Sequence, residues 1–389
     1  MVNGFKYLLV FLPIMFLTLF PASSIQQPPD SSESAVISYY EVNYTVTFNI
    51  TFINIGPSTI SGLEIWVSVI GNRTYGGLYD APVQDSYIIS ITPTPASTLR
   101  DVNNLDNEIL YFNTSIPANS TYMITMIYNI SSFEKIWLIS PSLIENYNTS
   151  SEIYLNYTKP ENFIESDNPL IISVARQLAS DVENPLLIVQ KFYEWVSSNI
   201  QYQIQTDERG ALWALENMVG DCSEYSDLFI ALCRAYGIPA RKVLGWAFSD
   251  PVNYMALGSY QYHNYSAHAW AEVYFEEYGW MAFDPTWGNS GYYYFGRMDP
   301  FHLVTIVGQN VSTTDFEASE FSFIGYRVNG TGDLSYSTDI SLDIIKISSI
   351  TESYSLEYAS LVIVVLVVIL FITGVVSKRT FKKSLRSVK

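Results

Sequence analysis

An alternation of apolar and polar residues runs through the chain between residues 34 and 140. In the stretch YTVTFNITFINIG, the apolar residues Val46, Phe48 and Ile50 alternate with threonine and asparagine. The stretches LEIWVSVIG, YIISITP and TYMITMIYNI repeat the pattern, and glycine, proline, asparagine and serine lie between them. A period of two is typical of strands that bury one face. Residues 34–140 are therefore expected to form an all-β sandwich of short antiparallel strands.

A helical pattern follows in the middle of the chain. Asn184 followed by Pro185 predicts the start of one helix, and a second short helix is expected over ERGALWALENMVGDC. A third helix is expected to begin at Cys222 and to end at Gly237, because an apolar stripe at helical spacing lies between them. From RKVLGW onward the pattern is again that of strands.

Both ends of the chain are apolar. Residues 1–24 place Lys6 before an apolar run and small residues after it, which predicts a signal peptide, with an uncleaved anchor as the alternative. Residues 358–376 give about 19 apolar positions, enough for a transmembrane helix. The tail at 377–389 is basic and has no acid, so we expect it in the cytoplasm and the bulk of the chain outside the cell. Residues 306–357 are expected to be further strands or a membrane-proximal stalk.

The charge of the chain excludes one class of partner. It has 38 acidic and 20 basic residues, a formal net charge of −18, and both apolar ends carry some of the basic residues. A nucleic-acid partner is therefore not expected. Asn-x-Ser/Thr triplets, none of which begins between Asn156 and Asn264, fit an exported glycoprotein. In composition alone, the low charge content and abundant tyrosine resemble surface proteins of thermoacidophilic archaea.

The chain contains two cysteines, Cys222 and Cys233. On one helix they would lie about 16 Å apart along the axis, which is too far for a disulfide. Cys233 lies on the apolar stripe and is expected to be a small core residue. Cys222 occupies the first turn, where backbone N–H groups and the helix dipole stabilise a thiolate. We therefore take Cys222 as a candidate nucleophile.

The stretch SAHAWAEVYFEEYGWMAFDPTWG predicts a hairpin that carries His268 and Asp284. A turn centred on Glu276 would place Asp284 opposite His268, and one centred on Glu277 would move it two positions along the same face. Either register leaves the carboxylate within reach of the imidazole. With the thiol of Cys222, these are the groups of a Cys–His–Asp nucleophilic site.

The segments GDCSEYSDLFIALCRAYGIPAR, HAWAEVYF and GWMAFDPTWG resemble, in order and spacing, the three motif blocks of the transglutaminase-like superfamily. The resemblance implies an α+β papain-like transglutaminase core over residues 160–305. The alternating strands before it predict an all-β immunoglobulin-like sandwich. The apolar residues 358–376 after it predict a C-terminal transmembrane helix. The resemblance further implies that Cys222 is the nucleophile, His268 the base and later acid, and Asp284 the orienting group. Members of the family transfer acyl groups through a thioester to an amine or to water.

The resemblance also bears on the oxyanion and on cofactors. Tyr202 lies where relatives tend to carry an aromatic donor, and an ordinary half-buried strand tyrosine is the alternative. The backbone N–H of Cys222 is expected to be another donor. There is no counterpart of the acidic calcium-binding segments of animal cross-linking enzymes, so no cofactor is expected. A zinc site made of His263, His268 and Cys222 is disfavoured, because their spacing is not a recognised zinc pattern.

The sequence therefore predicts an extracytoplasmic, membrane-anchored cysteine enzyme that acts on protein or peptide amides. Hydrolysis is favoured over cross-linking, because nothing in the chain would exclude water from the thioester. One alternative is a catalytically silent surface binding or scaffold protein with the same fold. Another is an envelope protein whose sandwich is the functional part and docks to cell-surface partners.

Overall fold

The computed structural model describes residues 35–355, except 76–80, 102–106, 249–259, 263–264, 277, 289–292, 309–310, 314–316, 319–322 and 329–333. The predicted signal peptide at 1–24, the predicted transmembrane helix at 358–376 and the basic tail at 377–389 lie outside the described residues. Among the helices that are described, none combines the length and the apolar character needed to cross a bilayer.

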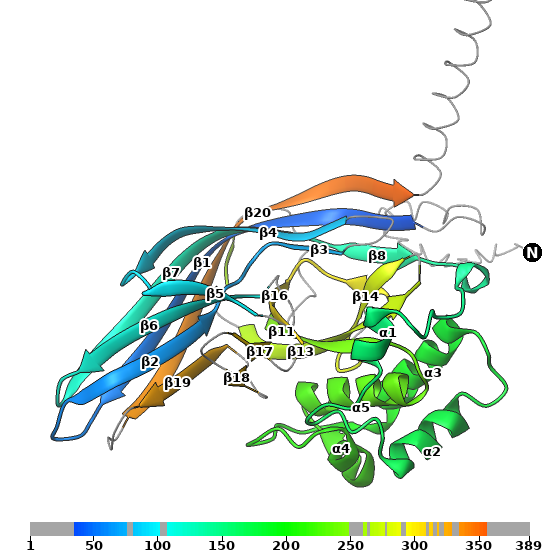
Figure 1. Cartoon of the computed structure of the whole chain (residues 1–389). Coiled ribbons are helices and arrows are strands. Elements are labelled where there is room, and N and C mark those ends of the chain that lie inside the picture. The colour runs from blue at the N-terminus through cyan, green and yellow to red at the C-terminus, as the bar shows by residue number, and fades with distance from the viewer. Residues whose placement is uncertain are drawn as a thin grey trace, which may run out of the picture. The chain divides into compact units, whose positions relative to one another are not determined.

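Two antiparallel sheets form a β-sandwich (Figure 1). The first sheet has eight strands in the order β12-β20-β1-β7-β4-β3, with β8 paired to β1 and β15 paired to β8, and the second has the order β19-β2-β6-β5. The strands of the first sheet are β1 (Ala35–Asn54), β3 (Arg73–Tyr75), β4 (Ala81–Thr92), β7 (Ser120–Phe133), β8 (Lys135–Leu138), β12 (Tyr260–Tyr262), β15 (Arg297–Met298) and β20 (Leu334–Ser355). Those of the second are β2 (Ile60–Ser68), β5 (Ser97–Arg100), β6 (Glu108–Ile116) and β19 (Ile324–Val328).

The core of the sandwich follows from the alternation along β1. At every second position from Val42 to Phe52, the side chain is at most 2% exposed. These side chains meet those of the facing sheet, among them Leu63 and Ile65 of β2. The polar residues between them lie on the other face of β1, so one strand separates core from surface.

The segment at 306–357 contributes to the sandwich rather than standing apart as a stalk. Strand β20 pairs with β1 along almost its whole length, from Ala35 opposite Ser355 to Asn54 opposite Leu334, and β19 pairs with β2. The sandwich is thus built from both ends of the described chain. The short strands β17 (Val311–Ser312) and β18 (Glu317–Ala318) pair with each other.

An α+β domain lies in the chain between β8 and β17. Its sheet has the order β14-β13-β11-β16, and a short parallel ladder joins β9 to β10. The strands are β9 (Gln201–Tyr202), β10 (Val219–Gly220), β11 (Ala240–Phe248), β13 (Tyr265–Phe275), β14 (Gly279–Phe283) and β16 (His302–Val307). The helices are η1 (Pro141–Leu143), α1 (Glu152–Tyr157), α2 (Pro169–Leu178), α3 (Pro185–Asn199), α4 (Ala211–Asn217) and α5 (Cys222–Ala235).

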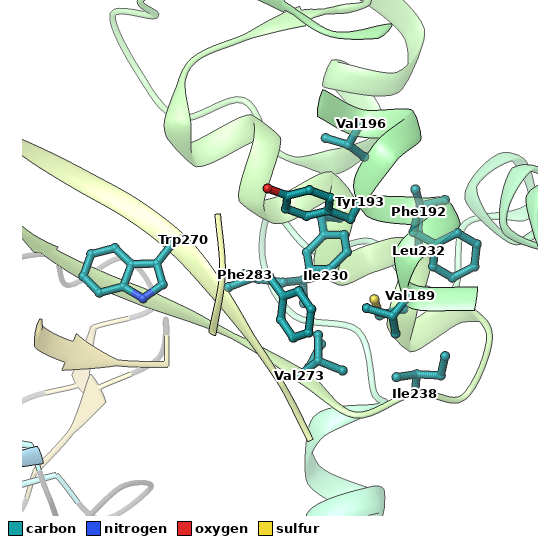
Figure 2. Close-up of a cluster of buried hydrophobic side chains, with 14 of the residues drawn as sticks. Val189, Phe192, Tyr193, Val196, Ile230, Leu232, Ile238, Trp270, Val273 and Phe283 are labelled. Carbon is teal, nitrogen blue, oxygen red and sulfur yellow. The ribbon is translucent and has the colours of Figure 1, made fainter. Parts of the chain in front are cut away.

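Helix α5 is the centre of this domain. It packs against β13 and β11 on one side and against α2, α3 and α4 on the others, so it is buried all round and not only along its apolar stripe. Figure 2 shows Val273 and Phe283 of the sheet lying beside Ile230 of α5. The charged residues of α5 have buried partners, since the Asp227 carboxylate lies 2.9 Å from the Lys242 ammonium.

The sandwich also holds β16 of the α+β sheet in place. Gln84 of β4 is buried, donates from its amide nitrogen to the carbonyl of Val304 at 2.8 Å, and accepts from the Val304 N–H at 2.8 Å. Asn107 makes the same pair of contacts with Val307, at 2.9 Å and 3.0 Å. Arg73 donates to the carbonyl of Thr305 at 3.1 Å. Residues in or next to both sheets of the sandwich therefore supply hydrogen bonds that fix a strand of the other domain.

We predict that Gln84→Ala destabilises the chain by about 3 kcal/mol, because it leaves buried backbone groups of Val304 without partners. Urea unfolding of the purified chain measures this change. The matched control is Gln177→Ala, an exposed glutamine of α2, which should change the free energy of unfolding by less than about 0.5 kcal/mol. Equal effects of the two variants would contradict the proposed role of Gln84.

Candidate active site

The segment Gly220-Asp221-Cys222 places the thiol at the N-terminus of α5. Asp221 is the N-cap, and its side chain accepts from the N–H of Ser223 at 3.0 Å. The Glu224 carboxylate accepts from the N–H of Asp221 at 2.9 Å and completes a capping box. Cys222 is therefore the first residue of the helix, half-buried, where the backbone N–H groups of the first turn lie around it.

Gly220 is required by the close approach of Glu224. A Cβ atom at position 220 would lie 2.3 Å from the Cβ of Glu224. Any side chain at position 220 would push the capping carboxylate away from the N-terminus of α5. Steric exclusion thus explains why position 220, before Asp221, is a glycine, and the sequence alone does not show this.

We predict that Gly220→Ala lowers the free energy of unfolding by about 1–3 kcal/mol, the usual effect of inserting a methyl group into a filled space. Gly71→Ala is the matched control, because nothing lies within 4 Å of a Cβ at Gly71. Unfolding of both variants in urea tests the difference. If Gly220→Ala proved as stable as Gly71→Ala, the steric explanation would be wrong.

The β13–β14 hairpin brings His268 and Asp284 together. Ala271 pairs with Phe283 and Tyr274 with Trp280, which is the second of the two registers expected from the sequence. His268 lies on β13, and Asp284 follows directly after β14. The Nε2 of His268 lies 2.9 Å from Oδ2 of Asp284, and both side chains are buried. Because a carboxylate only accepts hydrogen bonds, Nε2 is the donor.

The Asp284 carboxylate is also held by its own loop. Its Oδ1 accepts from the N–H of Thr286 at 2.9 Å and from the N–H of Trp287 at 3.3 Å. The indole of Trp287 stacks on the imidazole of His268, with ring centroids 4.7 Å apart and planes inclined by 21°. The loop after β14 thus fixes both the carboxylate and the imidazole plane.

The electrostatics of the pair favour an imidazolium on His268. Burial lowers the pKa of His268, but the charge of Asp284 and hydrogen bonds with Asp284 and Cys222 outweigh it and raise the pKa to about 10. Burial raises the pKa of Asp284, while His268 and His302 act against it, so that the pKa of this carboxyl lies below its usual value. Since Nε2 faces Asp284, the other ring nitrogen is the one available to Cys222. The contribution of the charged His268 to folding is complete below pH 6.5 and is lost as the pH rises through about 10.

We predict that Asp284→Asn lowers the pKa of His268 by about 1–3 units, because the variant keeps the burial and removes the opposite charge. An NMR titration of the labelled histidines in the purified chain measures the shift. Asp85→Asn, in an exposed carboxylate of β4, is the control and should leave the titration of His268 unchanged. An unchanged midpoint in Asp284→Asn would show that this carboxylate does not hold the proton.

Tyr202 lies beside the N-terminus of α5. The ladder between β9 and β10 pairs Tyr202 with Gly220, two residues before Cys222. Tyr202 is 54% exposed, and its pKa is raised to about 12 by partial burial and by the charges of Cys222, Asp221 and others nearby. The hydroxyl therefore stays protonated and is a hydrogen-bond donor at neutral pH. The structure thus places Tyr202, on a strand and about half exposed, beside the N-terminus of α5.

The loop between β9 and α4 is tied to α5 and β11. The N–H of Gln205 donates to Asp221 at 3.0 Å, and the N–H of Arg209 donates to Glu224 at 2.8 Å. The Glu208 carboxylate lies 2.5 Å from the ammonium of Lys242. The two residues that cap the helix of Cys222 thus also anchor the loop that follows Tyr202.

His302 and Asp299 are site residues that the sequence did not single out. His302 was seen only as one of three histidines. Its Nε2 lies 3.5 Å from Oδ2 of Asp284, and its Nδ1 lies 2.8 Å from Oδ1 of Asp299. The pairing of β16 with β11, which also pairs with β13, brings His302 to the site. The i,i+3 spacing of Asp299 and His302 was the one local signal, and it is a weak one.

One group of potential metal ligands is present in the part of the chain that the structure describes. One ligand atom each from His268, Asp284 and His302 lies within 4.8 Å of the others. These atoms already face one another as hydrogen-bond and ion-pair partners, and all three side chains are buried. We therefore interpret these three side chains as a hydrogen-bonded, charged cluster and not as a metal site. His263, of the disfavoured zinc site, lies outside the described residues.

Comparison with known proteins agrees with this geometry. Residues 172–285, which include Tyr202, Cys222, His268 and Asp284, match the transglutaminase-like superfamily. The chain contains a transglutaminase-like domain. An uncharacterized Bacillus subtilis protein, YebA, is 28% identical over 148 residues, which cover 34% of this chain and 20% of YebA. A Pseudomonas aeruginosa protein-glutamine gamma-glutamyltransferase is 37% identical over 71 residues, which cover 18% of this chain and 10% of that protein. The chain thus spans a fifth or less of these two relatives.

The fold has a counterpart among solved structures. A crystal structure of a "putative cysteine protease" from Cytophaga hutchinsonii aligns with a TM-score of 0.55 and 18% identity, covering 80% of this chain and 100% of that one. At this identity the likeness concerns the fold. The transglutaminase-like domain therefore has the expected papain-like α+β fold, within a chain of substantial β content.

Proposed function

We propose that the transglutaminase-like domain is a cysteine acyl-transfer enzyme that acts on protein or peptide amides through a thioester on Cys222, with water as the preferred acceptor. The observation that carries the proposal is the buried imidazole of His268, which is hydrogen-bonded to Asp284 through Nε2 and interacts electrostatically with Cys222 at the start of α5. A thiol beside an imidazole that a carboxylate orients is the arrangement of nucleophilic catalysis. The match to a gamma-glutamyltransferase over 71 residues supports an amide as the substrate class.

Acylation uses the ion pair between the thiolate and the imidazolium. The sulfur of Cys222 attacks the amide carbonyl, forms a carbon–sulfur bond and pushes the carbonyl electrons onto oxygen. When the intermediate collapses, the carbon–nitrogen bond breaks and the His268 imidazolium gives its proton to the departing nitrogen. The amine leaves and the acyl group stays on Cys222 as a thioester. Asp284 keeps the imidazole oriented throughout through its contact with Nε2.

Two groups near Cys222 are proposed as donors to the oxyanion. The backbone N–H of Cys222 belongs to the first turn of α5, where N–H groups have no partner within the helix. The hydroxyl of Tyr202 stays protonated because its pKa is raised to about 12, chiefly by partial burial. Donors placed in advance at this position are worth about 3 kcal/mol each in other enzymes. We therefore assign Tyr202 as the second donor.

Deacylation requires water or an amine at the thioester. The neutral His268 accepts a proton from the attacking molecule, the new bond forms at the carbonyl carbon, and the thiolate of Cys222 leaves. Tyr202 is 54% exposed and the nearby Ile204 is 77% exposed, so this side of the site is open to water. This openness supports hydrolysis over cross-linking.

The proposed location follows from the ends of the chain. The apolar residues 358–376, followed by a basic tail, support a single membrane span with its tail in the cytoplasm. The bulk of the chain, including the transglutaminase-like domain, would then lie outside the membrane, where its substrates are proteins or peptides. The sandwich remains a candidate surface for cell-surface partners.

We predict that Cys222 is the reactive thiol of the chain and that His268→Ala slows its alkylation by iodoacetamide at least about tenfold at pH 7, because the imidazolium that stabilises the thiolate is lost. Peptide mass spectrometry of the purified chain gives the rate at each cysteine. Cys233 is the internal control, since it is fully buried and burial raises its pKa. Similar rates in wild type and His268→Ala would favour the catalytically silent scaffold.

We further predict that a glutamine peptide offered together with a primary amine is converted mainly to the glutamate product, because water reaches the thioester. Mass spectrometry separates deamidated from amine-linked peptide. Cys222→Ala should form neither product. Predominant incorporation of the amine would replace the hydrolytic assignment with a cross-linking one.

A further inference from the structure

His302 lies between the carboxylates of Asp284 and Asp299, next to His268. It is 1% exposed, and its ring nitrogens face Oδ1 of Asp299 at 2.8 Å and Oδ2 of Asp284 at 3.5 Å. Both histidines therefore approach the same oxygen of Asp284, one from β13 and one from β16. His302 and Asp299 lie outside the segment that matches the superfamily.

Both carboxylates already accept hydrogen bonds on all sides. Asp299 accepts from the hydroxyl of Tyr294 and from the N–H of Phe301, in addition to His302. Asp284 accepts from two loop N–H groups on Oδ1 and from His268 on Oδ2. The donors around Asp284, together with the charges of His268 and His302, outweigh its burial and favour the ionised form of its carboxyl group.

This surrounding dictates the charge of His302. With one N–H only, the ring would donate to Asp299 and would turn a nitrogen lone pair toward the negative Oδ2 of Asp284 in a buried site. With both N–H groups, it donates to one carboxylate and faces the other as an ion pair. Burial lowers the pKa of His302, but Asp299 and Asp284 outweigh burial and raise it.

We propose that His302 is a second buried imidazolium that positions Asp284. The negative charge of Asp284 is then shared between His302 and His268. The proposal rests on the proposed function, because Asp284 acts on the reaction only through His268. His302 is a positioning residue, since it contacts Asp284 and acts on the reaction through that carboxylate. It gives the two neighbouring carboxylates a common counter-charge and keeps Oδ2 of Asp284 in place.

The charge of His302 lowers the pKa of His268 relative to a site without that charge. The two imidazole centroids lie 5.6 Å apart, so the charge of His302 disfavours a second positive charge on His268. Asp284 favours that charge, and the two effects oppose each other. A base that must give its proton to a leaving amine works best when its pKa is not too high. His302 therefore moderates the effect of Asp284 on His268.

Other groups around His302 do not alter this balance. Its ring lies against Trp270, Trp287 and Tyr294, at centroid distances of 5.2, 4.8 and 5.4 Å. The Tyr294 hydroxyl donates to Asp299. Tyr44 of the sandwich donates to the carbonyl of Pro300, and burial followed by the charge of Asp299 raises its pKa. Tyr44 thus stays neutral, and the charged groups described around His302 are Asp284, Asp299 and His268.

The first experiment measures the charge of His302 in the unaltered full chain. The sequence has three histidines, so ¹⁵N labelling of histidine gives three imidazole signals, which single His→Gln variants assign. At pH 8, where an ordinary histidine with a pKa of about 6.5 is neutral, both ring nitrogens of His302 should carry protons. A singly protonated His302 at pH 8 overturns the proposal. Asp299→Asn should convert His302 to the neutral form at that pH.

The second experiment separates charge sharing from a merely structural role. At the pH of half-protonation of His268 in the wild type, the imidazolium fraction of His268 should be higher in His302→Gln, because the variant removes the positive charge proposed for His302. A structural role alone would loosen the contact between His268 and Asp284 and lower that fraction, which would overturn the proposal. An unchanged fraction would overturn it as well.

The matched control is Thr305→Val on the same strand. Thr305 is 2% exposed and its hydroxyl has no hydrogen-bond partner among the described residues, so this change should leave the His268 signal as it is in the wild type. These measurements do not involve the reactivity of Cys222. A doubly protonated His302 at pH 8 together with slow alkylation of Cys222 would refute the proposed function. Rapid alkylation of Cys222 that depends on His268, together with a neutral His302, would refute only the inference.

Discussion

The buried carboxylate of Asp284 is the constraint on which the site depends. A fully buried negative charge is costly unless opposite charges and hydrogen-bond donors surround it. The structure supplies them from three places: His268 on β13, His302 on β16, and the backbone of the loop that begins at Thr286. Because these lie on separate strands, the carboxylate is satisfied only when the whole sheet is assembled. The same contacts that make the charge tolerable orient the imidazole toward Cys222.

The thiol side of the site is built by an independent device. Glu224 caps α5 and anchors the N–H of Arg209, while Asp221 caps the same helix and anchors the N–H of Gln205. One helix terminus thereby fixes Cys222 and the loop that follows Tyr202. In the proposed mechanism, the sheet side supplies proton transfer, and the helix side supplies the nucleophile and the oxyanion donors. Helix α5 packs directly on β13, which keeps the two sides in contact.

The sandwich takes part in this arrangement through β16. Gln84, Asn107 and Arg73 satisfy backbone groups of that strand, and β16 begins with His302. The proposed positioning residue is therefore held from one side by the sandwich and from the other by the α+β sheet. A sandwich that docks partners would lie directly against a strand of the catalytic domain. This gives the sandwich a structural role whether or not it binds a partner.

The sequence by itself determined the local features of this protein. Four features follow from patterns within about 20 residues. They are the alternation along β1, the cap at Asn184, the start of α5 at Cys222 and the two possible registers of the β13–β14 hairpin. From these it was possible to name Cys222, His268 and Asp284, and the resemblance to the family added Tyr202. Only the tertiary structure decided the rest. Strand β20 pairs with β1, α5 is buried on every side, and His302 contacts Asp284. Each of these contacts joins segments that lie far apart in the chain. Such contacts depend on which strand edges meet, and no short stretch of residues carries that information.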